Sequence, residues 1–336
     1  MSDSVSSASQ AREIDQLARS TMPALGIDLG GTKIRAGAVR NGALIGETRQ
    51  VATPDNPEGI IQALCDLVEQ FKTEIDLTGI GVATAGIVDC NTGEVIGSTG
   101  NLPGWAGTRL KSVLESRVLL PVLVENDANA AAYGESRSEA LRGLTCVVVV
   151  TLGTGIGGGI ILSGKLYRGS RFAAGEIGHI RISINNERLC TCGLFDCWEA
   201  YGSGRGLIAT AAQTLDGITE SQSPLARSVG SVSTYAIFAA ANQGDLLAQK
   251  IVHRWHEHVS HGMVNLAHIL NPDCFVLTGG LADSVDLQLL SDMIADRSLP
   301  VVSENVQVRH SELAGNAGLI GAAQLVVDEL LVGKSA

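Results

Sequence analysis

The sequence predicts an α/β protein with two lobes around a central cleft. Two stretches carry this prediction: residues 24–39 read as strand, glycine turn, strand, and residues 146–162 repeat that order. In the turns, DLGGT at residues 28–32 aligns with TLGTG at residues 151–155. One structural unit that occurs twice in 336 residues, a length suited to two average domains, indicates two lobes of similar fold.

Hydrophobic periodicity places the other elements. Residues 57–75 carry apolar side chains three and four positions apart, which is the pattern of an amphipathic helix, and Pro57 suits its first turn. Further helices are expected at 128–137, 204–215, 233–242, 245–270 and about 315–332, and strands at 79–85, 119–124 and 274–278.

These elements suggest the following domain boundaries. Residues 1–22, rich in Ser, Ala and Gln, are expected to form a flexible tail. A small lobe would span residues 23–124, and a larger lobe with a metal-binding loop at 176–199 would span residues 125–314. The last helix, at about 315–332, can return to the small lobe.

The composition limits the possible partners and compartment. A formal charge of −11 argues against a nucleic-acid backbone or an anionic membrane as the main partner. The first ten residues lack the basic start and apolar stretch of a signal peptide, and short apolar runs such as Val147–Val150 cannot span a bilayer. The sequence therefore predicts a cytoplasmic protein with reduced cysteines.

Three cysteines and a histidine stand in the spacing H-x10-C-x-C-x4-C. They are His179, Cys190, Cys192 and Cys197. Three thiolates and one imidazole complete a tetrahedral zinc shell and leave no open position for water, so the pattern predicts a structural zinc rather than ordinary buried thiols.

Two carboxylates, Glu176 and Glu199, flank this cluster. Surface carboxylates are usually only solvated. A polyol ligand, however, needs several fixed acceptors, and a loop held by zinc would supply them at low entropic cost.

The glycine turn at residues 28–32 has two interpretations. It can be an ordinary hairpin turn, or its N–H groups and Thr32 can contact phosphate oxygens while Asp28 holds a water of Mg²⁺.

The second glycine turn contains a G-x-G-x-x-G match within residues 153–159. A dinucleotide-binding fold requires a helix after these glycines, but an apolar strand follows here. A second phosphate-contacting hairpin fits better.

Asn126 and Asp127 precede a strong helical pattern. Either residue can cap the helix, and capping is the more common role. The alternative is a carboxylate at a strand-to-helix junction that takes a proton from a hydroxyl, as in kinases.

Five histidines lie in the predicted helix at 245–270. A solvated helix face is the favoured interpretation, and adventitious metal binding is the alternative.

Five motifs in this order resemble the ROK family (repressors, open reading frames, sugar kinases) of the actin-like, ribonuclease H-like ATPase superfamily. They are DLGGT, ENDANAAAYGE, TLGTGIGGG, GEIGH with CTCGLFDCWE, and VLTGGL. The resemblance covers nearly the whole chain after residue 23. It implies two actin-like lobes that close over a sugar and ATP with Mg²⁺.

The resemblance also implies roles for single residues. Asp127 resembles the catalytic base that activates the sugar 6-hydroxyl. The implied sugar-binding residues are Asn101, Asn126, Asp127, Glu176, His179 and Glu199, with His179 serving both zinc and sugar. The implied residues for ATP with Mg²⁺ are Asp28, Gly30, Gly31, Thr32, Lys33, Gly153, Thr154, Gly155, Gly279 and Gly280.

The family also includes transcriptional repressors with a helix-turn-helix domain before the first motif. Only 27 residues precede Asp28, so the kinase is favoured over the repressor. Two acceptors fit: N-acetylmannosamine is preferred by a small margin because EAYGSGRGLIATAAQ and ANQGDLLAQKIVHR resemble bacterial N-acetylmannosamine kinases, and glucose is the alternative. A homodimer is expected, and polyphosphate stays open as a donor.

Overall fold

The computed structural model describes residues 22–97, 102–218, 223–225, 232–304 and 306–331. The chain divides into two compact units, each with its own five-stranded sheet. Unit 1 comprises Met1–Gly143, Leu166–Ala174 and Gly315–Ala336, and unit 2 comprises Leu144–Lys165 and Gly175–Ala314. The expected α/β fold with two lobes is confirmed. Of the predicted tail, only residue 22 lies within the described residues.

The division between the units differs from the predicted boundary after residue 124. Helix α4 (Asp127–Ser136) belongs to unit 1, because it packs along α11 (Ala317–Val326), which also covers strands of that unit's sheet. Packing between segments far apart in the sequence decides this boundary, and hydrophobic periodicity carries no information about it.

The sheet of unit 1 has the strand order β3-β2-β1-β4-β7. Strands β1, β2 and β3 form an antiparallel meander, and β4 and β7 continue parallel to β1. The five strands are β1 (Ala24–Leu29), β2 (Lys33–Arg40), β3 (Ala43–Ala52), β4 (Ile80–Thr84) and β7 (Val122–Asn126). A separate two-stranded sheet joins β5 (Ile87–Asp89) to β6 (Glu94–Gly97).

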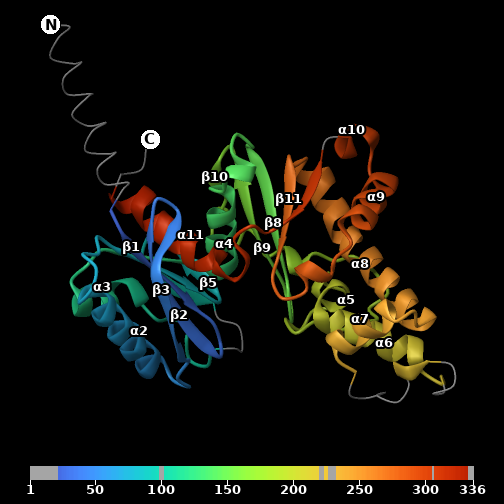
Figure 1. Cartoon of the computed structure of the whole chain (residues 1–336), viewed down its shortest axis with the longest axis horizontal. Helices are drawn as coiled ribbons and strands as arrows, with labels where there is room; N and C mark the ends of the chain where they lie inside the picture. The colour runs from blue at the N-terminus through green and yellow to red at the C-terminus, as the bar shows by residue number, and fades with distance from the viewer. Residues whose placement is uncertain (1–21, 98–101, 219–222, 226–231, 305, 332–336) are drawn as a thin grey trace, which may run out of the picture. The chain divides into compact units, whose positions relative to one another are not determined.

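Helices α2 (Pro57–Lys72) and α3 (Leu110–Val118) lie on one face of the unit 1 sheet, and α4 and α11 lie on the other (Figure 1). The start of α2 follows from local chemistry, because the Asn56 side chain accepts a 2.8 Å hydrogen bond from the Gly59 N–H and Pro57 occupies the first turn. The predicted apolar stripe of α2 is buried, although the helix ends at Lys72.

Glycines allow α11 to approach both the sheet and α4 closely. A Cβ atom at Gly81 would overlap the backbone carbonyl of Ala322, and one at Gly321 would overlap the carbonyl of Ala130. Because both neighbours are backbone atoms, neither can rotate away to make room.

We therefore expect Gly81→Ala to lower the free energy of unfolding by at least about 2 kcal/mol through overpacking. Gly97→Ala is the matched control, since its Cβ would meet only the Ile87 side chain at an ordinary 3.4 Å. Urea unfolding curves of both variants check the prediction. Equal stability of the two variants would show that the backbone at Gly81 can relax.

The sheet of unit 2 repeats the arrangement of unit 1, in the order β10-β9-β8-β11-β12. Strand β8 pairs antiparallel with β9 and parallel with β11, and β11 pairs parallel with β12. The strands are β8 (Cys146–Leu152), β9 (Ile156–Leu162), β10 (Lys165–Leu166), β11 (Cys274–Thr278) and β12 (Gln307–His310). A strand follows the second glycine turn, so the choice of a hairpin over a dinucleotide-binding turn is confirmed.

The α-helices of unit 2 are α5 (Glu199–Gly202), α6 (Gly204–Leu215), α7 (Thr234–Asn242), α8 (Leu246–Leu270), α9 (Leu287–Arg297) and α10 (Pro300–Ser303).

Short helical turns occur in both units. The 3₁₀ turns are η1 (Glu139–Leu141), η2 (Ile177–His179), η4 (Ala282–Ser284) and η5 (Ala314–Asn316), and a π-helical turn of unit 1, η6 (Val327–Leu331), continues α11. Within the described ranges, no helix is long and apolar enough to cross a bilayer.

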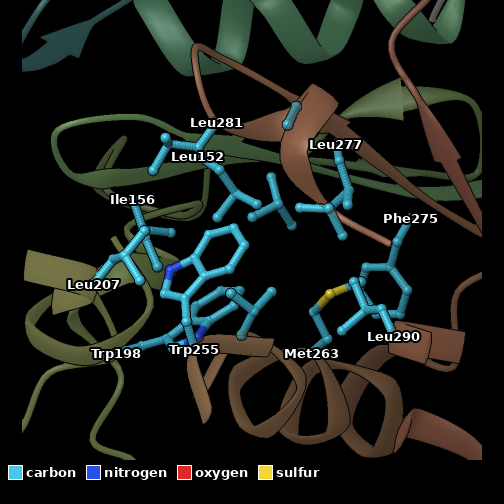
Figure 2. Packing of buried hydrophobic residues seen from close by; sticks show 14 of the residues in the cluster. Leu152, Ile156, Trp198, Leu207, Trp255, Met263, Phe275, Leu277, Leu281 and Leu290 are labelled. Atoms are coloured by element: carbon cyan, nitrogen blue, oxygen red, sulfur yellow. The ribbon is translucent and has the colours of Figure 1, made fainter. Parts of the chain in front are cut away.

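The core of unit 2 lies between its sheet and α8 (Figure 2). Trp198 and Trp255 are fully buried in it, next to Met263 and Phe275. The indole of Trp198 donates to the carbonyl of His258 at 2.9 Å, so both the apolar ring and its polar N–H are satisfied. Because Trp198 directly follows Cys197, this packing anchors one end of the cysteine-rich loop.

The sequence suggested that the histidines of α8 form one solvated face, and the structure shows that they do not. His256 is 1% exposed, and its Nδ1 lies 2.9 Å from the carbonyl of Val252. Its Nε2 lies 3.0 Å from the backbone nitrogen of Asp286, which caps α9. Since Nε2 must accept the Asp286 N–H, the ring is neutral with its proton on Nδ1.

This arrangement predicts that unit 2 loses stability in acid. Burial lowers the pKa of His256 below its usual 6.5, and burial lowers the pKa of His258 to about 3. The unfolded chain then binds more protons than the folded chain below pH 6.5, so the free energy of unfolding falls as the pH drops. At pH 5.5 the loss from His258 is about 1.4 kcal/mol, and the neutral ring of His256 adds to this loss.

Urea midpoints at pH 7.5 and pH 5.5 measure this loss. His256→Gln should reduce the pH dependence, whereas His253→Gln, an exposed position on the same helix, should leave it unchanged. An undiminished pH dependence in His256→Gln would contradict the assignment.

Candidate active site and metal cluster

The four residues of the predicted metal cluster come together in unit 2. One ligand atom from each of His179, Cys190, Cys192 and Cys197 lies within 4.8 Å of the other three. The Sγ atoms of Cys192 and Cys197 are 3.7 Å apart, as are Cys190 Sγ and His179 Nδ1. A tetrahedron with Zn–S bonds of about 2.3 Å has edges of about 3.8 Å, so the donor set fits zinc in both chemistry and spacing.

Asp196 organises the loop that carries the cysteines, a role that its place in the sequence did not reveal. Its fully buried carboxylate accepts the backbone N–H groups of Asn186, Glu187 and Arg188 at 2.6–3.1 Å and the Tyr201 hydroxyl at 2.7 Å. Burial alone would raise the pKa of Asp196, but the Tyr201 and backbone hydrogen bonds outweigh it and lower the pKa to about 2. Its backbone is left-handed, with φ of 60°. The carboxylate thus fixes the loop in this conformation.

Arg188 connects the same loop to the helical core of unit 2. Its guanidinium donates to the carbonyls of Ala200 and Gly206 and to the side chains of Thr210 and Gln213. Ala200 lies in α5, and the other three acceptors lie in α6, so the loop is bonded along that helix. Only a buried arginine with several fixed donors can make this set of contacts.

His179 presents its two ring nitrogens in different directions. Nδ1 faces Cys190, and Nε2 lies 3.8 Å from Glu176 Oε2. A metal on Nδ1 would therefore leave Nε2 on the side of the Glu176 carboxylate. Both side chains are partly exposed, at 34% and 46%, so an external hydroxyl can reach them.

Glu199 joins the metal loop to the second glycine turn. Its Oε2 accepts the Ile156 N–H at 3.0 Å, and its Oε1 accepts the Thr191 hydroxyl at 2.8 Å. A Cβ atom at Gly155 would overlap Oε2, so glycine at this position lets the carboxylate approach the hairpin. The predicted phosphate turn and the predicted sugar carboxylate are therefore in direct contact.

The Gly279–Gly280 turn lies at the same end of the sheet. Gly279 has φ of 92°, and the Leu281 N–H after the turn donates to the Leu152 carbonyl at 3.0 Å. Gly153 is held nearby, because its carbonyl accepts the Gly204 N–H at 2.8 Å. Unit 2 thus places Gly153, Thr154, Gly155, Gly279 and Gly280 at the carboxyl ends of β8 and β11, where open α/β sheets bind ligands.

In unit 1 the first glycine turn is braced by Thr53. Its hydroxyl donates to the Gly30 carbonyl at 2.7 Å, and its N–H donates to the Thr32 carbonyl at 3.0 Å. Gly31, Thr32 and Lys33 are exposed, so their polar groups are accessible to a ligand.

Asp28 and Asp127 are close enough to interact electrostatically. Burial raises the pKa of Asp28 to about 6, with a further contribution from the negative charge of Asp127, while Arg35 and Lys33 oppose the shift. Burial also raises the pKa of Asp127, and hydrogen bonds from the backbone oppose that shift. Gly318 at the start of α11 lies near both residues. Two carboxylates with raised pKa values, one near the end of β1 and one at the start of α4, form a candidate site for proton transfer and cation binding.

Asn126 caps α4, as the common interpretation expected. Its side-chain oxygen accepts the Asn129 N–H at 3.0 Å, and its amide donates to the Gly86 carbonyl at 2.9 Å. Asp127 stands at the first position of the helix, and its Oδ1 accepts the Ala128 N–H. The other predicted sugar ligand, Asn101, lies outside the described residues.

A sequence model of the ROK family matches residues 24–329. The chain belongs to the ROK family. The resemblance inferred from the five motifs is thereby confirmed, and the match includes every candidate residue named above.

Several similar proteins have sugar-kinase names. The chain is 38% identical over 309 residues to a protein from Streptomyces coelicolor named glucokinase, a match that covers 90% of this chain and 96% of the relative. Among solved structures, it is similar to a ROK family glucokinase from Streptomyces griseus in complex with glucose and AMPPNP. The two are 39% identical with a TM-score of 0.74, and the match covers 90% of this chain and 98% of the glucokinase. It is also similar to a ROK hexokinase from Thermus thermophilus, with 31% identity, 90% and 97% coverage and a TM-score of 0.75.

Proposed function

We propose that this protein is an ATP-dependent hexokinase that transfers the γ-phosphoryl group of ATP to the 6-hydroxyl of glucose. The observation that carries the proposal is the close similarity, at 39% identity, to a ROK glucokinase solved with glucose and AMPPNP, an ATP analogue. The candidate residues of both units supply the groups that such a transfer needs.

The acceptor preferred from the sequence alone was N-acetylmannosamine, and the relatives support the alternative, glucose, better. The relatives at 38% and 39% identity are named glucokinases. The helical segments at residues 199–213 and 241–254 that suggested N-acetylmannosamine fall in α5, α6, α7 and α8, where many side chains are core positions. Core residues reflect packing more than the choice of sugar.

Asp127 is the proposed general base. It would take the proton of the sugar 6-hydroxyl as the oxygen attacks the γ-phosphorus and ADP leaves from the opposite side. The pKa raised by burial makes this carboxylate a stronger base than a solvated one. Asn126 and the unit 2 residues Glu176, His179 and Glu199 would hold the sugar hydroxyls.

The two glycine turns are the proposed phosphate sites. Backbone N–H groups within residues 30–32 and 153–155, with Lys33 and the Thr32 hydroxyl, would neutralise charge on the phosphates. Asp28 would hold Mg²⁺ through water, and the metal would shield the phosphate oxygens. Gly279 and Gly280 would contact the adenosine, since neither glycine has a side chain to exclude it.

The metal cluster is proposed to be a structural zinc site. Its four protein ligands leave no position for water, so the ion would perform no chemistry itself. Its effect would be to orient His179 and to hold the loop that ends in Glu199. A homodimer stays a prediction, which sedimentation velocity can check.

A coupled assay that follows ADP release tests the proposed function. Glucose, mannose, N-acetylglucosamine and N-acetylmannosamine are compared at equal concentrations, and product formation from polyphosphate is measured in parallel. Glucose is expected to give the highest kcat/KM with ATP. A higher kcat/KM for N-acetylmannosamine would reject glucose as the acceptor, and no turnover with any of these sugars would reject the kinase.

A further inference from the structure

A short segment of the chain, Leu166–Ala174, leaves unit 2 and belongs to unit 1. It begins at the second residue of β10 and is followed directly by Gly175, where unit 2 resumes. The next residues carry Glu176 and His179, two of the proposed sugar ligands. Whatever holds this segment in unit 1 therefore fixes the point from which the sugar-binding residues depart.

Arg168 is the side chain that holds the segment. Its Nε donates to Glu125 Oε2 at 2.5 Å, and its Nη2 donates to Glu329 Oε1 at 2.8 Å. The side chains of Arg168 and Glu125 are 16% and 2% exposed. An ion pair this buried is screened little by water, and losing one partner leaves a buried charge without compensation.

The other oxygen of Glu125 shapes the start of α4. Its Oε1 accepts the backbone N–H of Asn126 at 2.9 Å and the side-chain amide of Asn129 at 3.0 Å. These bonds surround Asp127, which lies between the two asparagines. One oxygen of the Glu125 carboxylate thus binds the junction that carries the proposed base. The other oxygen binds Arg168 of the Leu166–Ala174 segment.

We propose that Arg168 is a positioning residue that couples the proposed base Asp127 to the sugar ligands Glu176 and His179. The coupling runs through Glu125, which Arg168 and the Asp127 junction share. The expected effect of Arg168 on kcat rests on the proposed function. Its expected effect on the local order of the backbone rests only on the contacts of unit 1. Arg168 touches neither the sugar nor the phosphates in this scheme.

Arginine is required because one planar guanidinium bonds two separate carboxylates. A lysine keeps the positive charge but concentrates it at a single point, so it cannot reproduce both directed bonds. Loss of the Glu125 bond would allow the segment and the Asp127 junction to shift separately. A displacement of about 1 Å in a reacting group can cost about 100-fold in rate.

The test compares Arg168→Lys with Arg137→Lys. Arg137 is a matched control, because its guanidinium also bonds a carboxylate of η6, Asp328, together with the Tyr133 hydroxyl of α4, whereas its described hydrogen bonds do not reach the Leu166–Ala174 segment. We expect Arg168→Lys to lower kcat for glucose about 10- to 100-fold and to raise the KM for glucose, with the KM for ATP unchanged. Arg137→Lys should stay within about twofold of the wild type.

Glu125→Gln supplies the second arm. If the two residues act as one unit, the kcat of the Arg168→Lys, Glu125→Gln double variant should be close to that of the worse single variant. The coupling would be overturned if the double variant lost kcat by the product of the two single losses. Equal losses of kcat in Arg168→Lys and Arg137→Lys would also overturn it.

Amide hydrogen exchange separates this proposal from the proposed function. Peptides that cover residues 166–179 and 122–129 should exchange faster in Arg168→Lys than in the wild type. In Arg137→Lys they should exchange at the wild-type rate. This readout needs no substrate. If the wild-type protein phosphorylates no sugar, the kinase assignment fails while the exchange result stands, and unchanged exchange in Arg168→Lys would overturn the positioning role by itself.

Discussion

Asp127→Asn is expected to lower kcat for glucose by about 10²- to 10⁴-fold, the usual range for a general acid–base group. The amide cannot accept the proton of the attacking hydroxyl. It can still accept the Ala128 N–H that Asp127 Oδ1 accepts at 2.9 Å, so the start of α4 should be preserved. Initial rates over a range of glucose and ATP concentrations measure the effect, and the KM values should change little.

Asp286→Asn is the control for this variant. Asp286 also begins a helix, accepts a backbone N–H and has no proposed chemical role. Asparagine caps helices as well as aspartate does, so this variant should keep full activity. Near-normal turnover in Asp127→Asn would remove Asp127 as the base, whereas a large loss in both variants would point to helix capping as the cause.

Cys197→Ser is expected to lose bound zinc and to raise the KM for glucose at least about tenfold, the scale on which residues around a metal affect a site. Cys197 is fully buried, and its neighbour Trp198 anchors the loop in the core of unit 2. Without the ion, the loop would keep the Asp196 and Arg188 networks and the hydrogen bonds of Trp198 and Glu199, but His179 would lose the contact that fixes its ring. Zinc content by atomic emission and glucose affinity by calorimetry measure the two effects.

Cys146→Ser provides the matched control, since Cys146 is a partly buried thiol of the same unit that lies outside the cluster. It should retain zinc and the glucose KM of the wild type. Loss of zinc without a change in glucose affinity would show that the metal stabilises the loop but does not orient the sugar ligands.

Elements with strong local signals were predictable from the sequence. Helix α6 and strand β11 match their expected ranges, because a capping serine and a continuous apolar run mark their ends. Strand β3 was not predicted, since much of it is exposed and lacks an apolar face. Its register comes from pairing with β2. Helix α9 was also missed, although Asp286 caps it.

The candidate site divides in the same way. The cysteine and histidine cluster was predictable because its four ligands are close in sequence and have metal-binding chemistry. Glu125 and Arg168 were not, because neither stands in a recognisable pattern and they meet only after the chain has folded. Asp196 gave a weak signal, as an acidic residue next to Cys197, but its role depends on N–H groups of residues 186–188.

By itself, the sequence determined the family, the duplicated glycine turns and the set of metal ligands, because each is a short-range pattern of residue types. The tertiary structure alone decided where the chain divides into units, since α4 and α11 meet through backbone contacts that only glycine permits. It also decided that Glu199 touches the second glycine turn and that Arg168 is bonded beside Asp127. These contacts join segments distant in the chain, and their energy comes from burial and charge pairing, which local sequence does not encode.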